Sequence, residues 1–225
     1  MTEFNIGFVI FPDLTQLDFT GPLQVLNRMP DAKTHVVAKS LDPVPSDCGL
    51  GLVPTVSFAD CPQLDLICVP GGSGVVQAMT DRTTVDFVRH QAERARYITS
   101  VCTGAFVLGM AGLLRGHRAT THWAYTDLLP RVGATVERGR VVWDGNVVTA
   151  GGVTSGIDFA LRIVAMLAGE DVAQSIQLSI EYDPAPPFAS GHPDHAPANV
   201  LQRATARFAS RRAAYEAALP GSPVA

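Results

Sequence analysis

Short apolar runs alternate with amphipathic segments along most of the chain. The runs are bounded by turn residues and are rich in β-branched and aromatic side chains, which is typical of buried strands in a parallel sheet. We expect strands at 4–11, 33–39, 64–69, 97–101 and 147–150. The segments between and after them predict helices over about 20–28, 80–96, 103–114, 124–131, 157–167, 171–182 and 198–219. This alternation predicts an α/β sandwich built on a mostly parallel sheet.

Three stretches interrupt the alternation. Residues 41–56 are rich in Pro, Gly and Asp and predict a small hairpin beside the main sheet. Asp144-Gly145 is a hairpin turn signal, so 135–142 is expected to pair with 147–150. A Pro-rich stretch at 184–197 separates the last helix from everything before it.

The composition narrows the class of protein. Apolar residues make up 47% of the chain and charged residues 17%, which allows a well-filled core and excludes bulk disorder. A chain of this length suits a single domain, 1–225, that ends in the C-terminal helix. The net charge of −4 argues against a nucleic-acid partner. No run approaches the roughly 18 apolar residues of a membrane span, so we expect no membrane association.

The N-terminus and the cysteines indicate a compartment. The chain starts without the basic region and apolar stretch of a signal peptide. The four cysteines are therefore expected to be reduced thiols, with Cys68 in the core, and the protein to be cytoplasmic. The six histidines show no convincing metal-ligand spacing, so no metal site is expected.

Cys102 stands where the expected strand 97–101 meets the expected helix 103–114. A cysteine on such a tight turn has its sulfur turned out of the sheet and lies at the positive end of the helix dipole. That position lowers a thiol pKa and makes the sulfur a nucleophile. The layout is that of a nucleophile elbow, although Ser100-Val-Cys-Thr-Gly104 lacks the first glycine of the usual pattern. The alternative is a buried structural cysteine.

Four loops that leave the carboxyl ends of strands carry reactive or backbone-exposing residues. They are 12–22, 70–74, 102–104 and 150–156. In sheets of this kind, ligands bind beyond the carboxyl ends of the strands. The convergence of these loops favours the active interpretation of Cys102.

Asp18 lies in the first of these loops, between Leu17 and Phe19. A carboxyl group flanked by apolar residues is poorly hydrated, so its pKa should rise. If it reaches the Cys102 sulfur, the two groups share one proton, and we expect a resting state of thiolate and protonated carboxyl. Such a pair combines a nucleophile with a general acid that later acts as a base. The alternative is an aspartate that caps its own loop.

Gly71 and Gly72 follow Pro70 at a strand end. Their N–H groups can face a developing negative charge, as can the N–H of Thr103. The alternative is a tight turn that needs a positive φ, and both interpretations can hold together.

A few further residues are candidates for the same site. His122 is a candidate third catalytic residue, although one packed beneath a loop would have the same local sequence. Trp123, Val153 and Phe188 are candidates for an apolar pocket wall, with ordinary core packing as the alternative for each.

Five motifs occur in an order that characterises a known family. They are Gln16-Leu-Asp-Phe-Thr-Gly-Pro22, Val69-Pro-Gly-Gly72, Thr99-Ser-Val-Cys-Thr-Gly-Ala105, Ala119-Thr-Thr-His-Trp123 and Gly151-Gly-Val-Thr-Ser-Gly-Ile-Asp158. The chain resembles the PfpI-type branch of the glutamine-amidotransferase-like superfamily over nearly its whole length. Within that branch it is most similar to the enzymes that hydrate isocyanides.

The resemblance implies a flavodoxin-like three-layer sandwich, a homodimer, a small-molecule isocyanide substrate, and no cofactor or metal. It also implies roles: Cys102 as nucleophile, Asp18 as general acid and base, and Thr103 as a functional position. Many relatives have Glu where this chain has Asp18. Val153 stands where the isocyanide-hydrating members have Ile, which should widen the pocket slightly.

Two other functions share some of these motifs. Similar sequences occur in the N-terminal domain of AraC-type transcription regulators, which would make this chain a ligand-binding module. Ala225 ends the chain with room for only one helix after the motifs, and the acidic balance disfavours DNA binding. A glyoxalase, deglycase or protease of the wider superfamily is the third possibility, and Asp18 in place of Glu weighs against it.

Overall fold

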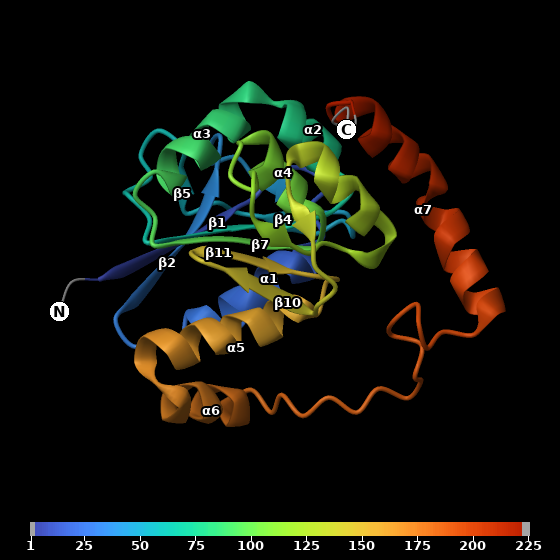
Figure 1. Cartoon of the computed structure of the whole chain (residues 1–225). Coiled ribbons are helices and arrows are strands. Elements are labelled where there is room, and N and C mark those ends of the chain that lie inside the picture. The colour runs from blue at the N-terminus through green and yellow to red at the C-terminus, as the bar shows by residue number, and fades with distance from the viewer. Residues whose placement is uncertain (1–2, 222–225) are drawn as a thin grey trace.

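Seven strands form one central sheet in a computed structural model that describes residues 3–221 (Figure 1). The strand order is β10-β11-β7-β6-β1-β2-β5. The bounds are β1 Phe4–Val9, β2 Ala32–Ala38, β5 Val56–Ser57, β6 Leu66–Val69, β7 Tyr97–Val101, β10 Val141–Asp144 and β11 Val147–Ala150. Every neighbouring pair is parallel except β10 and β11, which form an antiparallel edge. The expected mostly parallel sheet is confirmed.

Helices cover both faces of this sheet (Figure 1). One layer contains α1 Gln16–Leu26, α5 Ser155–Ala168 and α6 Glu170–Ser179, and the other contains α2 Val75–Thr80, α3 Arg82–Ala92 and α4 Ala105–Met110. The central strands are covered on both sides, and every residue of β6 and β11 is buried. This double burial explains why these strands are continuous apolar runs in the sequence. The architecture is the predicted three-layer α/β sandwich.

Helix α1 begins earlier than the sequence suggests, at Gln16 instead of about residue 20. Asp18 therefore lies in the first turn of a helix and not in a loop. The Thr15 side chain does not cap this helix but donates to Asp47 (Oγ1 to Oδ2, 2.6 Å). The Thr15 backbone N–H donates to the Gly71 carbonyl at 2.9 Å. Contacts with distant loops, which local sequence does not show, hold the start of this helix.

The helix expected over 80–96 is α3, Arg82–Ala92, and it is shorter at both ends; a separate helix, α2, Val75–Thr80, precedes it. Asp81 lies between them and caps α3 by accepting a hydrogen bond from the Thr84 backbone N–H at 2.9 Å. Aspartate is a favoured residue at this position because its carboxylate satisfies a free helix N–H. The sequence pattern does not predict the short α2.

The helix expected over 103–114 is also shorter. It consists of a 3₁₀ turn, η1 Cys102–Gly104, followed by only six residues of α4. Gly112, with a φ of 81°, lies in the turns that follow. Because the segment is apolar throughout, its composition did not reveal where the helix ends.

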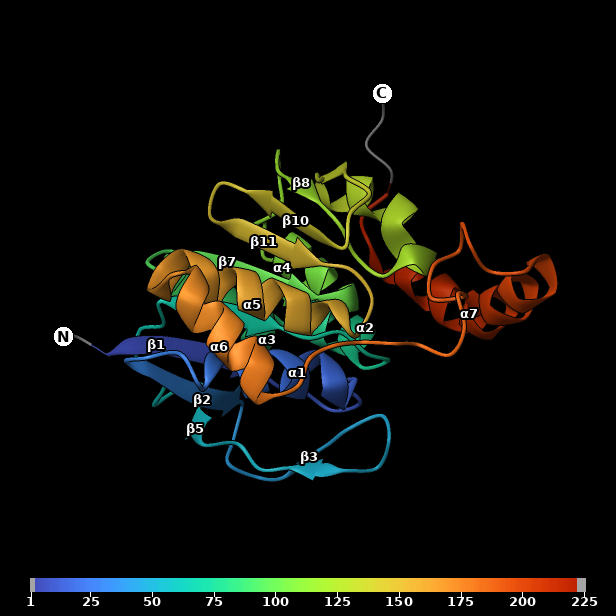
Figure 2. The same cartoon turned by 90° about the horizontal axis from the view of Figure 1, so that it is seen from below.

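Small elements surround the main sheet. The expected hairpin at 41–56 is the antiparallel pair β3 Val44–Pro45 and β4 Gly51–Leu52, which projects from the body (Figure 2). The hairpin of β10 and β11 is confirmed, while Thr135–Val136 forms β9 and pairs with β8, Arg118–Ala119. Between β8 and β9 lies a 3₁₀ segment, η2 Trp123–Val132.

The C-terminal helix stands apart from the sandwich along most of its length. Residues 184–197 run as an irregular strap to α7, Ala198–Ala218, and the last turns of α7 return to the body near α2 and η2 (Figure 1). Tyr215 and Leu219 are the buried residues at this end. Within residues 3–221, no helix has the length and apolar character needed to cross a membrane.

Candidate active site

Cys102 has the backbone of a nucleophile elbow. It follows β7 with a φ of 56°, in the left-handed region that non-glycine residues seldom adopt. Its N–H donates to the Gly151 carbonyl at 2.8 Å, and its carbonyl accepts from the Thr121 hydroxyl at 2.7 Å. These two bonds hold a conformation that costs on the order of 1–3 kcal/mol. The expected elbow is confirmed, and the side chain is buried, with 6% of the residue exposed.

Asp18 is completely buried at the start of α1. Its Oδ2 accepts a hydrogen bond from the Gly71 backbone N–H at 2.9 Å. Its Oδ1 is buried and has no hydrogen-bond partner among the described residues. Burial raises the pKa of Asp18 to about 7, and hydrogen bonds with Gly71 and Cys102 oppose that rise. The raised pKa expected for this carboxyl is confirmed.

Burial also raises the pKa of the Cys102 thiol well above its ordinary value, and the charge of Asp18 adds to this rise. Hydrogen bonds from the backbone N–H and hydroxyl of Thr103 lower it, but by less. The predicted fall in the thiol pKa is therefore wrong. The dipole of a six-residue helix that begins after a 3₁₀ turn is small, and desolvation outweighs it. A thiol with a raised pKa and a carboxyl with a pKa of about 7 thus share one buried site.

Gly71 lies where Cys102, Asp18 and Thr103 come closest together. A Cβ on Gly71 would lie 2.6 Å from the Thr103 nitrogen, 2.8 Å from Asp18 Oδ2 and 2.8 Å from the Cys102 Cβ. Only glycine lets three chain segments meet at such distances. The geometry thus brings together Cys102, Asp18, Thr103 and Gly71 as the sequence predicts.

The two glycine N–H groups are already engaged within the protein. Gly71 donates to Asp18, and Gly72 donates to the Thr103 hydroxyl at 3.2 Å. The sequence predicts that they face a negative charge developing on a ligand. In this structure they position the acid and the threonine instead. Gly72 has a φ of 132°, so the turn interpretation also applies to it.

His122 is placed among aromatic rings. Its ring lies 5.5 Å from Trp123, 5.9 Å from Tyr125 and 5.0 Å from Phe208, measured between centroids. Its Nδ1 accepts from the Ala124 N–H at 3.3 Å, and burial lowers its pKa to about 4. Across the described chain it makes no hydrogen bond to Cys102 or Asp18. His122 is therefore neutral near pH 7 and packs among aromatic rings, and no hydrogen bond links it to the pair.

The other candidates for the apolar pocket wall differ in their burial. Trp123 is half-buried in the same aromatic cluster, and Val153 is half-buried in the turn between β11 and α5. A Cβ on Gly152, next to Val153, would lie 3.5 Å from His122, so this turn and the aromatic cluster are adjacent. Phe188 is 78% exposed on the strap, and its expected place in a pocket wall is wrong for this chain.

Tyr215 is a residue of this site that sequence reasoning missed. It lies on α7, is 2% exposed, and its hydroxyl donates to the Gly72 carbonyl at 3.3 Å. Its ring packs against Phe106 and Tyr125. No local signal marks it, since one tyrosine in an alanine-rich helix is ordinary, and only the folded chain brings it beside Gly72.

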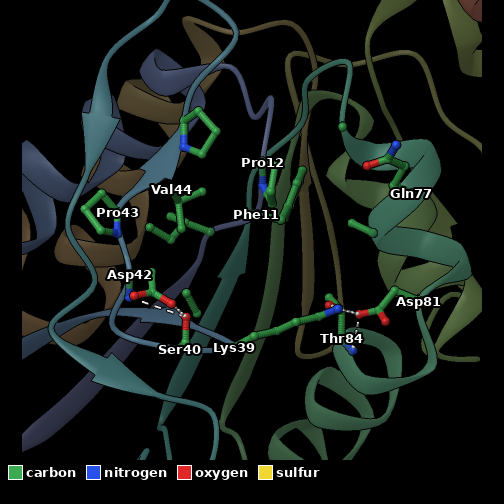
Figure 3. Close-up of a pocket in the computed structure, with 15 residues that line it drawn as sticks. Phe11, Pro12, Lys39, Ser40, Asp42, Pro43, Val44, Gln77, Asp81 and Thr84 are labelled. Atoms are coloured by element: carbon green, nitrogen blue, oxygen red, sulfur yellow. Dashed lines mark hydrogen bonds and ion pairs between the residues drawn. The ribbon is translucent and has the colours of Figure 1, made fainter.

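A cavity of about 350 Å³ lies next to this site, on the side of β2 (Figure 3). Its lining includes apolar side chains such as Phe11 and Val44, and Lys39 reaches across to Asp81, with 2.7 Å between Nζ and Oδ2. Pro12 and Gly74, which flank the site loops, form part of its wall, whereas Cys102 and Asp18 do not line it. This cavity is thus separate from the reactive pair.

Comparison with known proteins agrees with this geometry. The sequence profile of the DJ-1/PfpI family matches residues 5–166. The chain is 59% identical over 205 residues to a protein of Pseudomonas putida named isonitrile hydratase, covering 91% of this chain and 90% of that one. A ThiJ/PfpI family protein from Pseudomonas syringae has a crystal structure with a TM-score of 0.94 and 42% identity, covering 96% of this chain and 90% of that one.

A regulator shows a weaker similarity. The transcriptional regulator GbdR of Pseudomonas aeruginosa is 27% identical over 80% of this chain, and the match spans 51% of the regulator. Three observations indicate the same family: the fold, the elbow cysteine beside a buried carboxyl, and the sequence match over most of the chain. The chain belongs to the DJ-1/PfpI family.

Proposed function

We propose that the chain is an isocyanide hydratase, an enzyme that adds water to R–N≡C and releases an N-substituted formamide. The observation that carries the proposal is the pairing of Cys102 on its elbow with the buried Asp18 carboxyl. Its second support is the 59% identity to the Pseudomonas putida isonitrile hydratase, isonitrile being another word for isocyanide. The pair provides both a nucleophile and a proton donor to the same small, linear substrate.

The first half of the reaction forms a covalent bond to sulfur. Asp18 takes the thiol proton, and the Cys102 sulfur attacks the terminal carbon of the isocyanide. Asp18 then gives that proton to the same carbon, so the product is a neutral thioimidate, R–N=CH–S–Cys. The free Oδ1 is the oxygen we assign to this transfer, because Oδ2 is held by Gly71.

The second half adds water. The ionised Asp18 removes a proton from water while the water oxygen attacks the thioimidate carbon. Asp18 then passes that proton to the thioimidate nitrogen. The tetrahedral adduct then loses its hydroxyl proton to Asp18 as the carbon–sulfur bond breaks. The formamide R–NH–CHO leaves, Asp18 is protonated, and return of its proton to sulfur restores the starting pair. One water is consumed, and no electron is exchanged.

The surrounding residues fit this role. Hydrogen bonds from Thr103 lower the pKa of Cys102 and so favour the transient thiolate. We assign the apolar group of the substrate to the wall formed by Val153, neutral His122 and Trp123. A small apolar substrate without charge requires no cationic side chain in such a wall.

The test is hydration of an aryl isocyanide, followed by absorbance and by mass identification of the formamide. Cys102→Ala and Asp18→Asn should each abolish turnover. Exposed Cys48→Ala is the matched control and should behave as wild type. Intact mass after brief exposure should show one adduct, on Cys102. Turnover that survives either active-site change contradicts the assigned roles.

The same preparation separates the alternatives. A methylglyoxal assay tests glyoxalase or deglycase activity, and ligand binding without turnover of any of these substrates would favour the regulator-like module. We also propose that residues 1–225 act as one domain, that two copies form a homodimer, and that the protein works in the cytoplasm. The free state of all four cysteines is consistent with a reducing compartment.

A further inference from the structure

The end of the C-terminal helix, α7, reaches the loop of Gly71 and Gly72, which hydrogen-bonds to Asp18. Tyr215 comes from a helix whose other half stands away from the body, yet its hydroxyl is the group that contacts Gly72. That hydroxyl donates to the Gly72 carbonyl at 3.3 Å, and the Thr103 side chain also hydrogen-bonds with it. A buried phenol needs such a partner, because an unpaired hydroxyl in an apolar setting is costly.

Gly72 connects this tyrosine to both functional side chains. On one side, the Gly72 N–H donates to the Thr103 hydroxyl at 3.2 Å. On the other side, the preceding Gly71 N–H donates to Asp18 at 2.9 Å. Two successive glycines have no side chains to restrict their dihedral angles, so hydrogen bonds to their carbonyls help to decide where their N–H groups lie. The Thr15 N–H holds the Gly71 carbonyl at 2.9 Å, and the Gly72 carbonyl accepts from the Val75 N–H at 3.3 Å and from the Tyr215 hydroxyl. Tyr215 is the side-chain anchor of this loop.

The helix end is itself firmly attached. The Arg212 guanidinium donates to the Ala124 carbonyl and to Asp127 Oδ1, both at 2.9 Å. Arg131 donates to the Leu219 carbonyl at 2.7 Å and also to the Pro220 carbonyl. These bonds cross from η2 to the last turns of α7. They fix the position of Tyr215 relative to the site loop more closely than its own hydrogen bonds would.

We infer that Tyr215 is a positioning residue, which holds Gly71 and Gly72 so that their N–H groups stay on Asp18 and Thr103. The inference adds a function for the last helix to the proposed hydratase and rests on that proposal for its kinetic part only. Loss of the hydroxyl should loosen the Gly71 hydrogen bond, which opposes the raised pKa of Asp18. The acid limb of Cys102 reactivity should then move to higher pH. The other titratable groups whose charges act on this pair or on Tyr215 are Asp47, Cys68, Tyr125 and Arg211.

The experiment compares wild type with Tyr215→Phe, which keeps the ring between Phe106 and Tyr125 and removes only the hydroxyl. Tyr97→Phe is the matched control, because its hydroxyl contacts Met166 at the opposite end of β7. Two readouts are taken over a range of pH: kcat and KM with an aryl isocyanide, and the rate of Cys102 alkylation by iodoacetamide. All rates are measured below the melting temperature of each variant.

We expect Tyr215→Phe to lower kcat about threefold to tenfold with KM unchanged, the effect of one lost hydrogen bond. We also expect the acid limb of its alkylation profile to shift to higher pH, while Tyr97→Phe matches wild type. Arg212→Ala, which loosens the helix end without touching the site loop, should shift the limb in the same direction. A Tyr215→Phe protein with the wild-type alkylation profile overturns the inference. Absence of turnover in wild type, with the alkylation shift present, would refute the hydratase proposal and leave the positioning role supported.

Discussion

Replacing Asp18 with asparagine should make the protein inactive and, at neutral pH, more stable. The carboxyl pKa rises from an ordinary value of 3.8 to about 7 on folding. Between these values the folded state keeps a proton that the unfolded chain has released, so wild type loses stability as pH rises through this window. The difference of about three pH units, at about 1.4 kcal/mol each, amounts to ~4 kcal/mol. Asparagine is neutral in both states and escapes this loss.

The assay is urea unfolding of wild type and Asp18→Asn at about pH 4 and about pH 8. The asparagine carbonyl can still accept from Gly71, and any cost of its buried amide is the same at both pH values. The free-energy gap between the two proteins should therefore grow in favour of the variant by up to ~4 kcal/mol as pH rises. Asp31→Asn is the control, at an exposed residue with a φ of 60° that asparagine tolerates. A gap that does not change with pH would show that folding does not raise the Asp18 pKa.

Three further outcomes follow from the same geometry. Gly71→Ala should lower kcat about tenfold to a hundredfold, because its Cβ would lie 2.6 Å from the Thr103 nitrogen and 2.8 Å from Asp18 Oδ2 and would break the bond to the acid. The wild-type kcat/KM should rise with pH through about 7, because below that value Asp18 is protonated and cannot take the thiol proton. Gly104→Ala should lower the melting temperature, since its Cβ would lie 2.1 Å from the Val69 carbonyl oxygen, and overpacking costs about 1–3 kcal/mol or more.

The controls for these outcomes are simple. Gly51→Ala places its Cβ in open space and should change neither kcat nor the melting temperature. A Gly71→Ala enzyme with normal kcat would mean that the loop moves aside and keeps its hydrogen bond to Asp18. A kcat/KM that stays flat from about pH 5 to pH 8 would exclude Asp18 as the base. A Gly104→Ala protein that melts with wild type would mean that the end of β6 yields to the added methyl group.

Part of this site could be predicted because its signals are local. The strand predicted over 97–101 matches β7 residue for residue. A short run of β-branched and aromatic residues that begins directly after Arg96 has few alternatives to a strand. The elbow at Cys102 followed from the junction itself, and its φ of 56° agrees. The burial of Asp18 followed from its apolar neighbours in sequence. The family motifs then placed these groups together.

The rest depended on contacts between distant segments. The start of α1 rests on Gly71 and Asp47, which are far away in the chain. Thr15 is a residue type that favours a helix start, but its hydroxyl bonds to Asp47 and does not cap the helix. The role of Tyr215 depends on a helix that returns to the body 143 residues after Gly72. Helix α4 ends early inside a wholly apolar segment, where hydrophobic periodicity carries no information about boundaries.

The short α4 also changes how the sulfur acquires its charge. A long helix beginning at Cys102 would have favoured a permanent thiolate, whereas six residues after a 3₁₀ turn leave burial as the dominant effect. In the proposed mechanism, the sulfur is charged only while Asp18 holds its proton. Because that same proton is the one that the substrate carbon needs, the proposal produces nucleophile and acid in a single transfer. A buried thiol with a raised pKa also resists oxidation between turnovers, since oxidants react with the thiolate. In this proposal the pair combines a protected resting state with reactivity that begins only when Asp18 accepts a proton.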